Sequence, residues 1–153
     1  MDKELLTVIY YAITSILLWT DITRLLLPYK LTVLLISVGL LYACFNQCLM
    51  NHLFGLLFGV SIFFIIYIVS FWVYQQEGLG LGDILLSAGI GAFWGLNHVI
   101  YTIYASCIMS GCVALILLLF TSKKKQDAIP FGPFLILSSW GTHLFQIYLD
   151  NGL

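Results

Sequence analysis

The distribution of charged residues divides the chain into long apolar segments. No charged residue occurs from position 31 to position 76, a run of 46 residues. As a single helix this run would be about 69 Å long, more than twice the hydrocarbon thickness of a bilayer. It must therefore fold back on itself, and the polar cluster from Asn46 to His52 is the predicted turn. The neutral stretch from Ile84 to Ser122 is also too long for one helix, and we expect it to break at Gly95–His98.

Six helices follow from these breaks once Leu5–Trp19 and Phe131–Leu149 are added at the two ends. The composition agrees, because 61% of the residues are hydrophobic and only 8% are charged, whereas an ordinary soluble domain is about 25% charged. A net charge of −1 provides no basic surface for nucleic acid. The sequence therefore predicts an all-α protein in a lipid bilayer, a bundle of six transmembrane helices that forms a single domain over residues 1–153.

The cations predict the orientation of this bundle. If successive connections alternate between the two sides of the membrane, Arg24, Lys30 and Lys123–Lys125 fall on one side and Lys3 on the other. An excess of lysine and arginine marks the cytoplasmic side. We therefore expect both termini outside and a location in the bacterial plasma (inner) membrane. His52 and His98 are expected in turns on the outer side.

Asp83 is the most informative of the acidic residues. The stretch from Ile84 to Gly95 has only 12 residues, about 18 Å of helix, which is too short to cross a bilayer. We therefore expect the helix to start nearer Gly78, which draws Asp83 toward the bilayer interior. A charged side chain at such depth normally faces protein or water rather than lipid. The alternative is a loop with Asp83 as the N-cap of the helix.

Two patterns surround Asp83. Small or polar residues repeat every four positions and so share one helix face: Asp83, Ser87, Gly91 and Gly95. Stripes of small residues are where membrane helices pack closely, so Asp83 is predicted to point into the bundle. The preceding segment has glycine at alternate positions, which disfavours a regular helix and allows another backbone to approach: Gly78, Gly80 and Gly82.

Asp21 lies at the end of the first predicted span, on the same side as Asp83. Taken alone, it fits an interfacial acid partnered with Arg24. Taken together, two aspartates emerge at the same depth from two helices. Carboxyl groups about 3 Å apart would share one proton. One of them could then accept a proton from water while the other polarises a scissile carbonyl, as in aspartic proteases.

Three segments resemble the signatures of type IV prepilin peptidases, the A24 family of GxGD-type aspartic peptidases. Asp21–Pro28 is similar to the D-x5-I-P-N motif, Gly80–Asp83 to the GxGD motif, and Ile129–Leu135 to the signature before the last span. Further residues match these segments or the glycines of the helix after GxGD, and we expect them to be structural: Pro28, Gly91, Gly95, Pro130, Gly132 and Pro133.

This resemblance implies a membrane endopeptidase that removes the leader of prepilins or pseudopilins at the cytoplasmic face. Asp21 and Asp83 correspond to the catalytic aspartates, and Gly78, Gly80 and Gly82 would let the substrate backbone approach. The mechanism needs no cofactor and no metal. A small proton-coupled transporter and a non-catalytic relative that assembles with pilus or secretion machinery are the alternatives.

The chain departs from the family pattern in three ways. Tyr29 replaces the usual asparagine after the proline of the first motif, and Leu85 replaces the usual lysine after GxGD. The N-terminal region with cysteine pairs that larger members carry is not found in this sequence, so a short form without methyltransferase activity is expected. The sequence does not indicate an oligomeric state.

Overall fold

The computed structural model describes residues 3–74, 80–120 and 130–152, which are all-helical apart from short connections. They form six helices: α1 (Lys3–Arg24), α2 (Tyr29–Phe45), α3 (Leu49–Tyr74), α4 (Leu81–Trp94), α5 (Leu96–Phe120) and α6 (Gly132–Gly152). The all-α prediction is confirmed for these residues. Three of the helices, α1, α3 and α5, are long and apolar enough to cross a membrane.

The helices break where glycine or polar residues interrupt the apolar pattern. The turn between α2 and α3 contains Gln47, which has a positive φ of 55°. Gly95 separates α4 from α5 with a φ of 85°, a conformation that glycine adopts at little cost. Both predicted breaks are therefore confirmed. The first helix continues beyond the expected end at Trp19 to Arg24, so Asp21 lies inside it.

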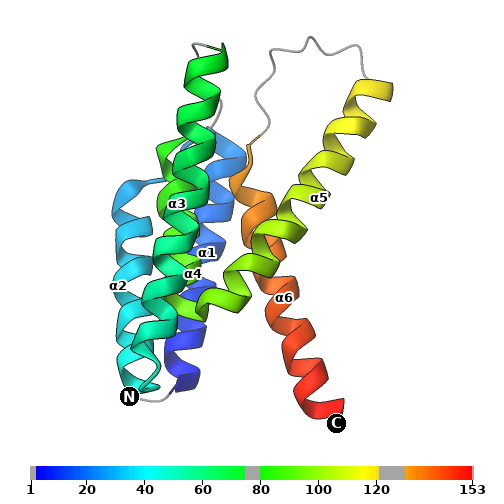
Figure 1. Ribbon diagram of the computed structural model, residues 1–153. Helices are drawn as coiled ribbons and strands as arrows, with labels where there is room; N and C mark the ends of the chain where they lie inside the picture. Colours follow the sequence, from blue (N-terminus) through cyan, green and yellow to red (C-terminus); the bar gives the residue numbers. More distant parts are fainter. Residues whose placement is uncertain (1–2, 75–79, 121–129, 153) are drawn as a thin grey trace.

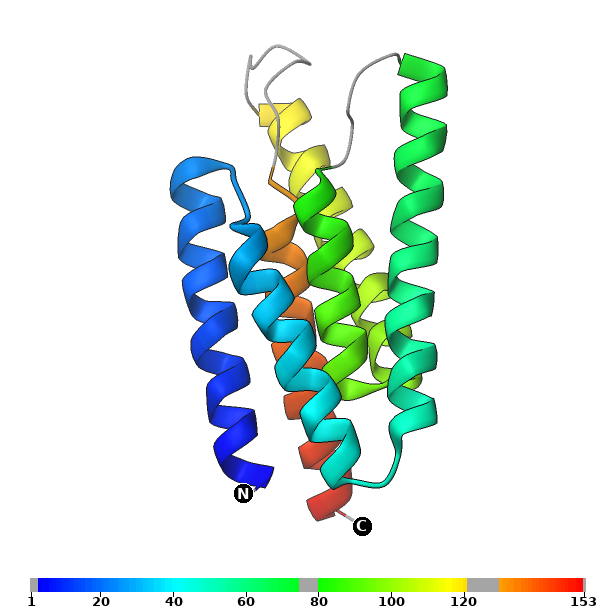
Figure 2. The ribbon, with the colours of Figure 1, turned by 90° about the vertical axis from the view of Figure 1, so that its left-hand side faces the viewer.

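The short helix α4 lies at the centre of the bundle, between α2 and α3 (Figure 2). Ten of its 14 residues are buried, and it is only about 21 Å long. It begins at Leu81 and not nearer Gly78, because Gly80 is extended and serves as its N-cap. The longer span that we expected is therefore wrong, and so is the alternative that Asp83 caps the helix. A helix that is apolar on nearly all sides is suited to such an interior position.

The small-residue face of α4 packs directly on α3. A Cβ atom on Gly91 would collide with the carbonyl oxygen of Gly55, so the two backbones are in contact there. One turn away, the Ser87 hydroxyl donates a hydrogen bond to the carbonyl oxygen of Gly59 at 3.2 Å. The predicted packing face is thus confirmed, and its partner is a pair of glycines on α3, Gly55 and Gly59. Close backbone approach of this kind is typical of membrane helix pairs.

Side-chain hydrogen bonds attach α6 to its neighbours, and α5 and α6 cross each other (Figure 1). The hydroxyl groups of Tyr10 and Ser139 are 2.5 Å apart, and the Trp140 indole donates to Thr14 Oγ1 at 3.1 Å. These two contacts join α1 to α6. Because polar groups buried in an apolar bundle are costly unless paired, they fix the relative register of the two helices.

Candidate active site

Two aspartates from different helices lie at the same end of the bundle. Asp21 is in the last turn of α1 and Asp83 in the first turn of α4, and these helix ends lie at the same end of the molecule (Figure 2). Their side chains are buried, with 5% and 9% of their surface exposed. Both acids adjoin the same side chain, Leu27, through Gly82 next to Asp83 and through Gly132 against Asp21. The burial of Asp83 agrees with the expectation that it points into the bundle, and Asp21 is buried at the same end.

One oxygen of each carboxyl group has no hydrogen-bond partner within the described part of the chain. These atoms are Asp21 Oδ2 and Asp83 Oδ1, both shielded from solvent. A buried polar atom without a partner is energetically costly. Such a cost is typical of groups that act on a proton, a water molecule or a substrate. Arg24, one turn after Asp21, is exposed.

Two glycines allow neighbouring segments to approach the aspartates. A Cβ atom on Gly132, the first residue of α6, would collide with Asp21 Oδ2 and lie 3.3 Å from Leu27 Cδ1. A Cβ atom on Gly82, next to Asp83, would lie 2.6 Å from Leu27 Cβ and 3.2 Å from Leu27 Cδ1. The α1–α2 connection and the first turns of α4 and α6 therefore meet around the carboxyl groups. These are the three segments in which the sequence motifs were found.

The residues expected to be structural lie in these segments or on the α3–α4 interface. Pro28 precedes α2 in an extended conformation and is its N-cap. Pro130 lies just before α6, and Pro133 is in its first turn, where proline is tolerated because the first N–H groups need no helical partner. Gly80 caps α4. Gly78 lies outside the described residues.

Phe63 on α3 belongs to the site but could not be identified from the sequence. The α3–α4 contacts pair Gly55 with Gly91 and Gly59 with Ser87, and the same register places Phe63 opposite Asp83. Its side chain is 1% exposed, and its ring centroid is 5.6 Å from that of Phe131, just before α6. Phe63 therefore packs against Phe131 beside the start of α6, at the level of Asp83 along α4. A phenylalanine within an apolar helix carries no local signal of such a role.

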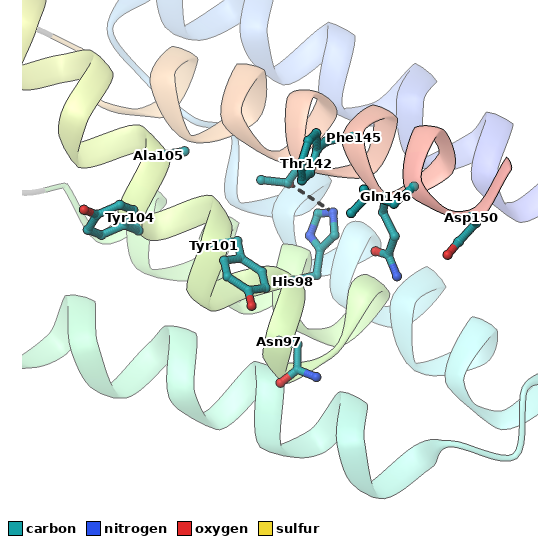
Figure 3. Close-up of a pocket in the computed structure, with 10 residues that line it drawn as sticks. Asn97, His98, Tyr101, Tyr104, Ala105, Thr142, Phe145, Gln146 and Asp150 are labelled. Atoms are coloured by element: carbon teal, nitrogen blue, oxygen red, sulfur yellow. Dashed lines mark hydrogen bonds between the residues drawn. The ribbon is translucent and has the colours of Figure 1, made fainter. Parts of the chain in front are cut away.

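The histidines lie at the other end of the bundle, and the expectation for two of them is wrong. His52 and His98 are buried inside α3 and α5 rather than in outer turns, because both helices begin earlier than predicted. The His52 Nδ1 donates to the carbonyl of Ala92 at 3.0 Å. His98 lies between α5 and α6, where its Nε2 is 3.1 Å from Thr142 Oγ1 (Figure 3).

Two cavities of about 620 Å³ and 490 Å³ open at this other end. His98 lines the larger one, and His52 lines the smaller one together with Trp94. Neither cavity is lined by Asp21 or Asp83. Within residues 3–74, 80–120 and 130–152, the histidine, cysteine and acidic side chains form no group of three or more that could hold a metal ion.

The fold and the site together define a class of protein, a helical membrane protein with a pair of buried carboxyl groups at one end. Residues 8–121, which include both aspartates, match the type IV leader peptidase family. The chain therefore belongs to this family, which makes it an enzyme of the peptidase class, a hydrolase. Family membership together with the apolar helices indicates a multi-pass protein of the bacterial inner membrane. The resemblance found from the three motifs is confirmed.

Several relatives support this assignment. The leader peptidase HopD of Escherichia coli is 34% identical over 143 residues, which cover 88% of this chain and 90% of that protein. The prepilin leader peptidase/N-methyltransferase of Aeromonas hydrophila is 29% identical over 97% of this chain and 52% of its own length. The protein of the same name from Pseudomonas aeruginosa is 31% identical over 85% and 47%. The chain thus spans about half the length of the latter two relatives. No solved structure matches the chain.

Proposed function

We propose that this protein is a membrane aspartic endopeptidase that cleaves the leader peptide of prepilins or pseudopilins. The proposal depends on one observation above all, the pair of buried aspartates at one end of the bundle, each with an unpartnered oxygen among the described residues. Two carboxyl groups that interact across a short distance share a proton, so one is a base while the other is an acid. Membership of a leader peptidase family supports the same reaction.

In the proposed mechanism, the ionised aspartate takes a proton from a water molecule, which attacks the scissile carbonyl carbon. The protonated aspartate donates a hydrogen bond to the carbonyl oxygen and so stabilises its developing charge. The tetrahedral intermediate then breaks at the C–N bond, and the amine leaves with a proton from the pair. Water is consumed, an acid and an amine are formed, and the pair again holds one proton. The chemistry requires no cofactor.

The alternate glycines give the substrate a route to this pair. Gly80 and Gly82 lie at the start of α4, and Gly78 precedes them in the sequence. Without side chains, this segment lets an extended peptide approach its backbone. The apolar stem of a prepilin would lie between helices while its leader stays in the cytoplasm, which brings the cleavage site to the depth of Asp21 and Asp83.

We further propose that the six helices form one bundle in the inner membrane, a single domain over residues 1–153, with both termini outside and the active site facing the cytoplasm. Within this bundle the short helix α4 is covered by its neighbours and need not match the bilayer thickness. Arg24 and Lys30 lie at the aspartate end of the bundle and Lys3 at the other end. Lys123–Lys125 come between α5 and α6 in the sequence and fall outside the described residues. This charge distribution supports a cytoplasmic aspartate end.

Substitution of the two aspartates tests the function. Asp21→Asn and Asp83→Asn each remove one ionisable oxygen while keeping the side-chain shape. We expect each variant, purified and incubated with a prepilin, to lose leader cleavage by at least about 10²-fold, since each loses general acid–base catalysis. Asp150→Asn, on an exposed residue of α6, is the matched control and should cleave normally. A leader-sized loss of mass is the readout.

The same assay separates the alternatives. Near-normal cleavage by either Asp21→Asn or Asp83→Asn would exclude that residue from the mechanism. If the wild-type protein in vesicles moved protons and left the prepilin intact, it would be a proton-coupled transporter. If it did neither and still bound pilus or secretion components, it would be a non-catalytic relative.

A further inference from the structure

We propose that Leu27 is a positioning residue that fixes the separation of Asp21 and Asp83, a role that rests on the proposed aspartic peptidase function. Leu27 itself carries no reactive group. Its importance comes from the two glycines that it contacts, because one of them adjoins Asp83 in the sequence and the other packs against the Asp21 carboxyl group.

The Leu27 side chain occupies the space of a side chain on Gly82 and lies close to Gly132. A Cβ atom on Gly82 would lie 2.6 Å from Leu27 Cβ, and a Cβ atom on Gly132 would lie 3.3 Å from Leu27 Cδ1. One leucine therefore determines how closely the first turn of α4 and the first turn of α6 approach the α1–α2 connection. Packed interiors transmit such displacements because they contain few voids.

The backbone on either side holds Leu27 in place. Leu25 has a positive φ of 52°, and its N–H donates to the carbonyl oxygen of Asp21 at 2.9 Å. On the other side Pro28 has a φ of −64° and caps α2, and a residue before proline is restricted to extended conformations. Leu27 thus connects the aspartate-bearing end of α1 to the start of α2, and its backbone conformation is restricted on both sides.

The separation of the carboxyl groups controls the proposed chemistry. Two interacting acids titrate with two macroscopic constants whose spacing depends on their coupling. The active form holds one proton, so rate against pH should be bell-shaped, with a width set by this coupling. Truncation of Leu27 leaves a void between α4 and α6 and lets the carboxyl groups move apart, which weakens the coupling. The pH–rate profile should then become narrower.

The test compares Leu27→Ala with Leu26→Ala, which shortens the neighbouring leucine of the same connection. Leu26 is 69% exposed and contributes none of the atoms nearest to a Cβ on either glycine. We expect Leu27→Ala to lower kcat by about 10- to 100-fold, as for a small misplacement of reacting groups, with KM nearly unchanged and a narrower pH–kcat profile. Leu26→Ala should retain the wild-type kcat and width. Leu27→Met, which conserves volume, should restore most of the wild-type behaviour.

A wild-type bell width in Leu27→Ala would overturn the proposal, and so would an equal effect in Leu26→Ala. Activity is normalised to folded protein measured by thermal unfolding in detergent. If Leu27→Ala does not accumulate, Leu27→Val takes its place and should narrow the pH–kcat profile by a smaller amount. An unchanged profile width in Leu27→Val would also overturn the proposal. If Asp21→Asn and Asp83→Asn remain active, the proposed function itself fails. If they are inactive while Leu27→Ala keeps the wild-type profile, only the role of Leu27 fails.

Discussion

Glycine residues of α6 differ sharply in what a side chain would meet. A Cβ atom on Gly132 would collide with Asp21 Oδ2, whereas a Cβ atom on Gly141, nine residues later on the same helix, would meet nothing within 4 Å. The two positions share a helix and a residue type, so they separate the local requirement of the site from the general effect of glycine on a helix. The contrast leads to a prediction about the geometry of Asp21.

Gly132→Ala should impair cleavage without unfolding the protein. The added methyl group would collide with Asp21 Oδ2, and because a carboxyl group can rotate, we expect it to turn away from its reactive position. Leader cleavage should fall by about 10-fold or more, in keeping with the sensitivity of catalysis to small displacements. Cleavage of a prepilin and thermal unfolding in detergent are the two measurements.

Gly141→Ala is the control for this substitution. The methyl group has free space, and alanine favours a helix over glycine by up to about 1 kcal/mol, so activity should be unchanged and stability equal or higher. Full activity of Gly132→Ala would show that Asp21 tolerates a displaced carboxyl group, contrary to the tight fit seen in the structure.

At the residue level, the sequence reveals charged groups far better than apolar ones. Asp21 and Asp83 could be found because charge is rare in this chain and costly within a bilayer, so an acid within the apolar segments indicates a functional site. Leu27 and Phe63 could not be found in this way, because one apolar residue among many has no distinguishing chemistry. Their contacts arise only when α3, α4 and α6 come together, which is information that no local pattern contains.

At the level of elements, the short helix α4 depends on close contact with α3. Its 14 residues do not reach across a hydrocarbon layer, and its burial by neighbouring helices removes the need to match that thickness. The breaks at Asn46 and at Gly95 could be predicted from polarity and glycine. The start of α4 could not be predicted, because we required every helix to span the full hydrocarbon thickness. We did not consider a short helix that is buried by its neighbours.

Gly91→Ala should weaken the protein at the α3–α4 interface. The new methyl group would meet the carbonyl oxygen of Gly55, which belongs to a helix backbone and cannot rotate away as a side chain can. The helices must separate, and forced overpacking costs about 1–3 kcal/mol. We expect a clear fall in the thermal unfolding midpoint in detergent.

The matched control is Gly111→Ala on α5, where nothing lies within 4 Å of the added methyl group. Its midpoint should stay the same or rise. Equal midpoints for the two variants would mean that α3 and α4 do not pack backbone to backbone in the folded protein.

At the level of the whole molecule, the two ends of the bundle differ in chemistry. One end holds the aspartates and the cations Arg24 and Lys30. The other end holds the polar turn between α2 and α3 and the two cavities with their buried histidines. Prepilin leaders are cleaved by this protein only if the aspartate end faces the compartment that contains the leader. The orientation of the ends therefore decides whether the proposed chemistry can take place.

Cysteine labelling can determine this orientation, because the α2–α3 turn contains a natural reporter. Cys48 is exposed at the end away from the aspartates, so a variant that retains it and carries serine at positions 44, 107 and 112 should react with a membrane-impermeant maleimide added to intact cells. The opposite reporter is Leu26→Cys in a chain without other cysteines, in the exposed α1–α2 connection. It should react only after the membrane is permeabilised, because the excess of cations keeps that end in the cytoplasm. The reverse labelling pattern would place the aspartate pair outside the cell, where a cytoplasmic leader could not reach it, and both proposals for the site would then have to be abandoned.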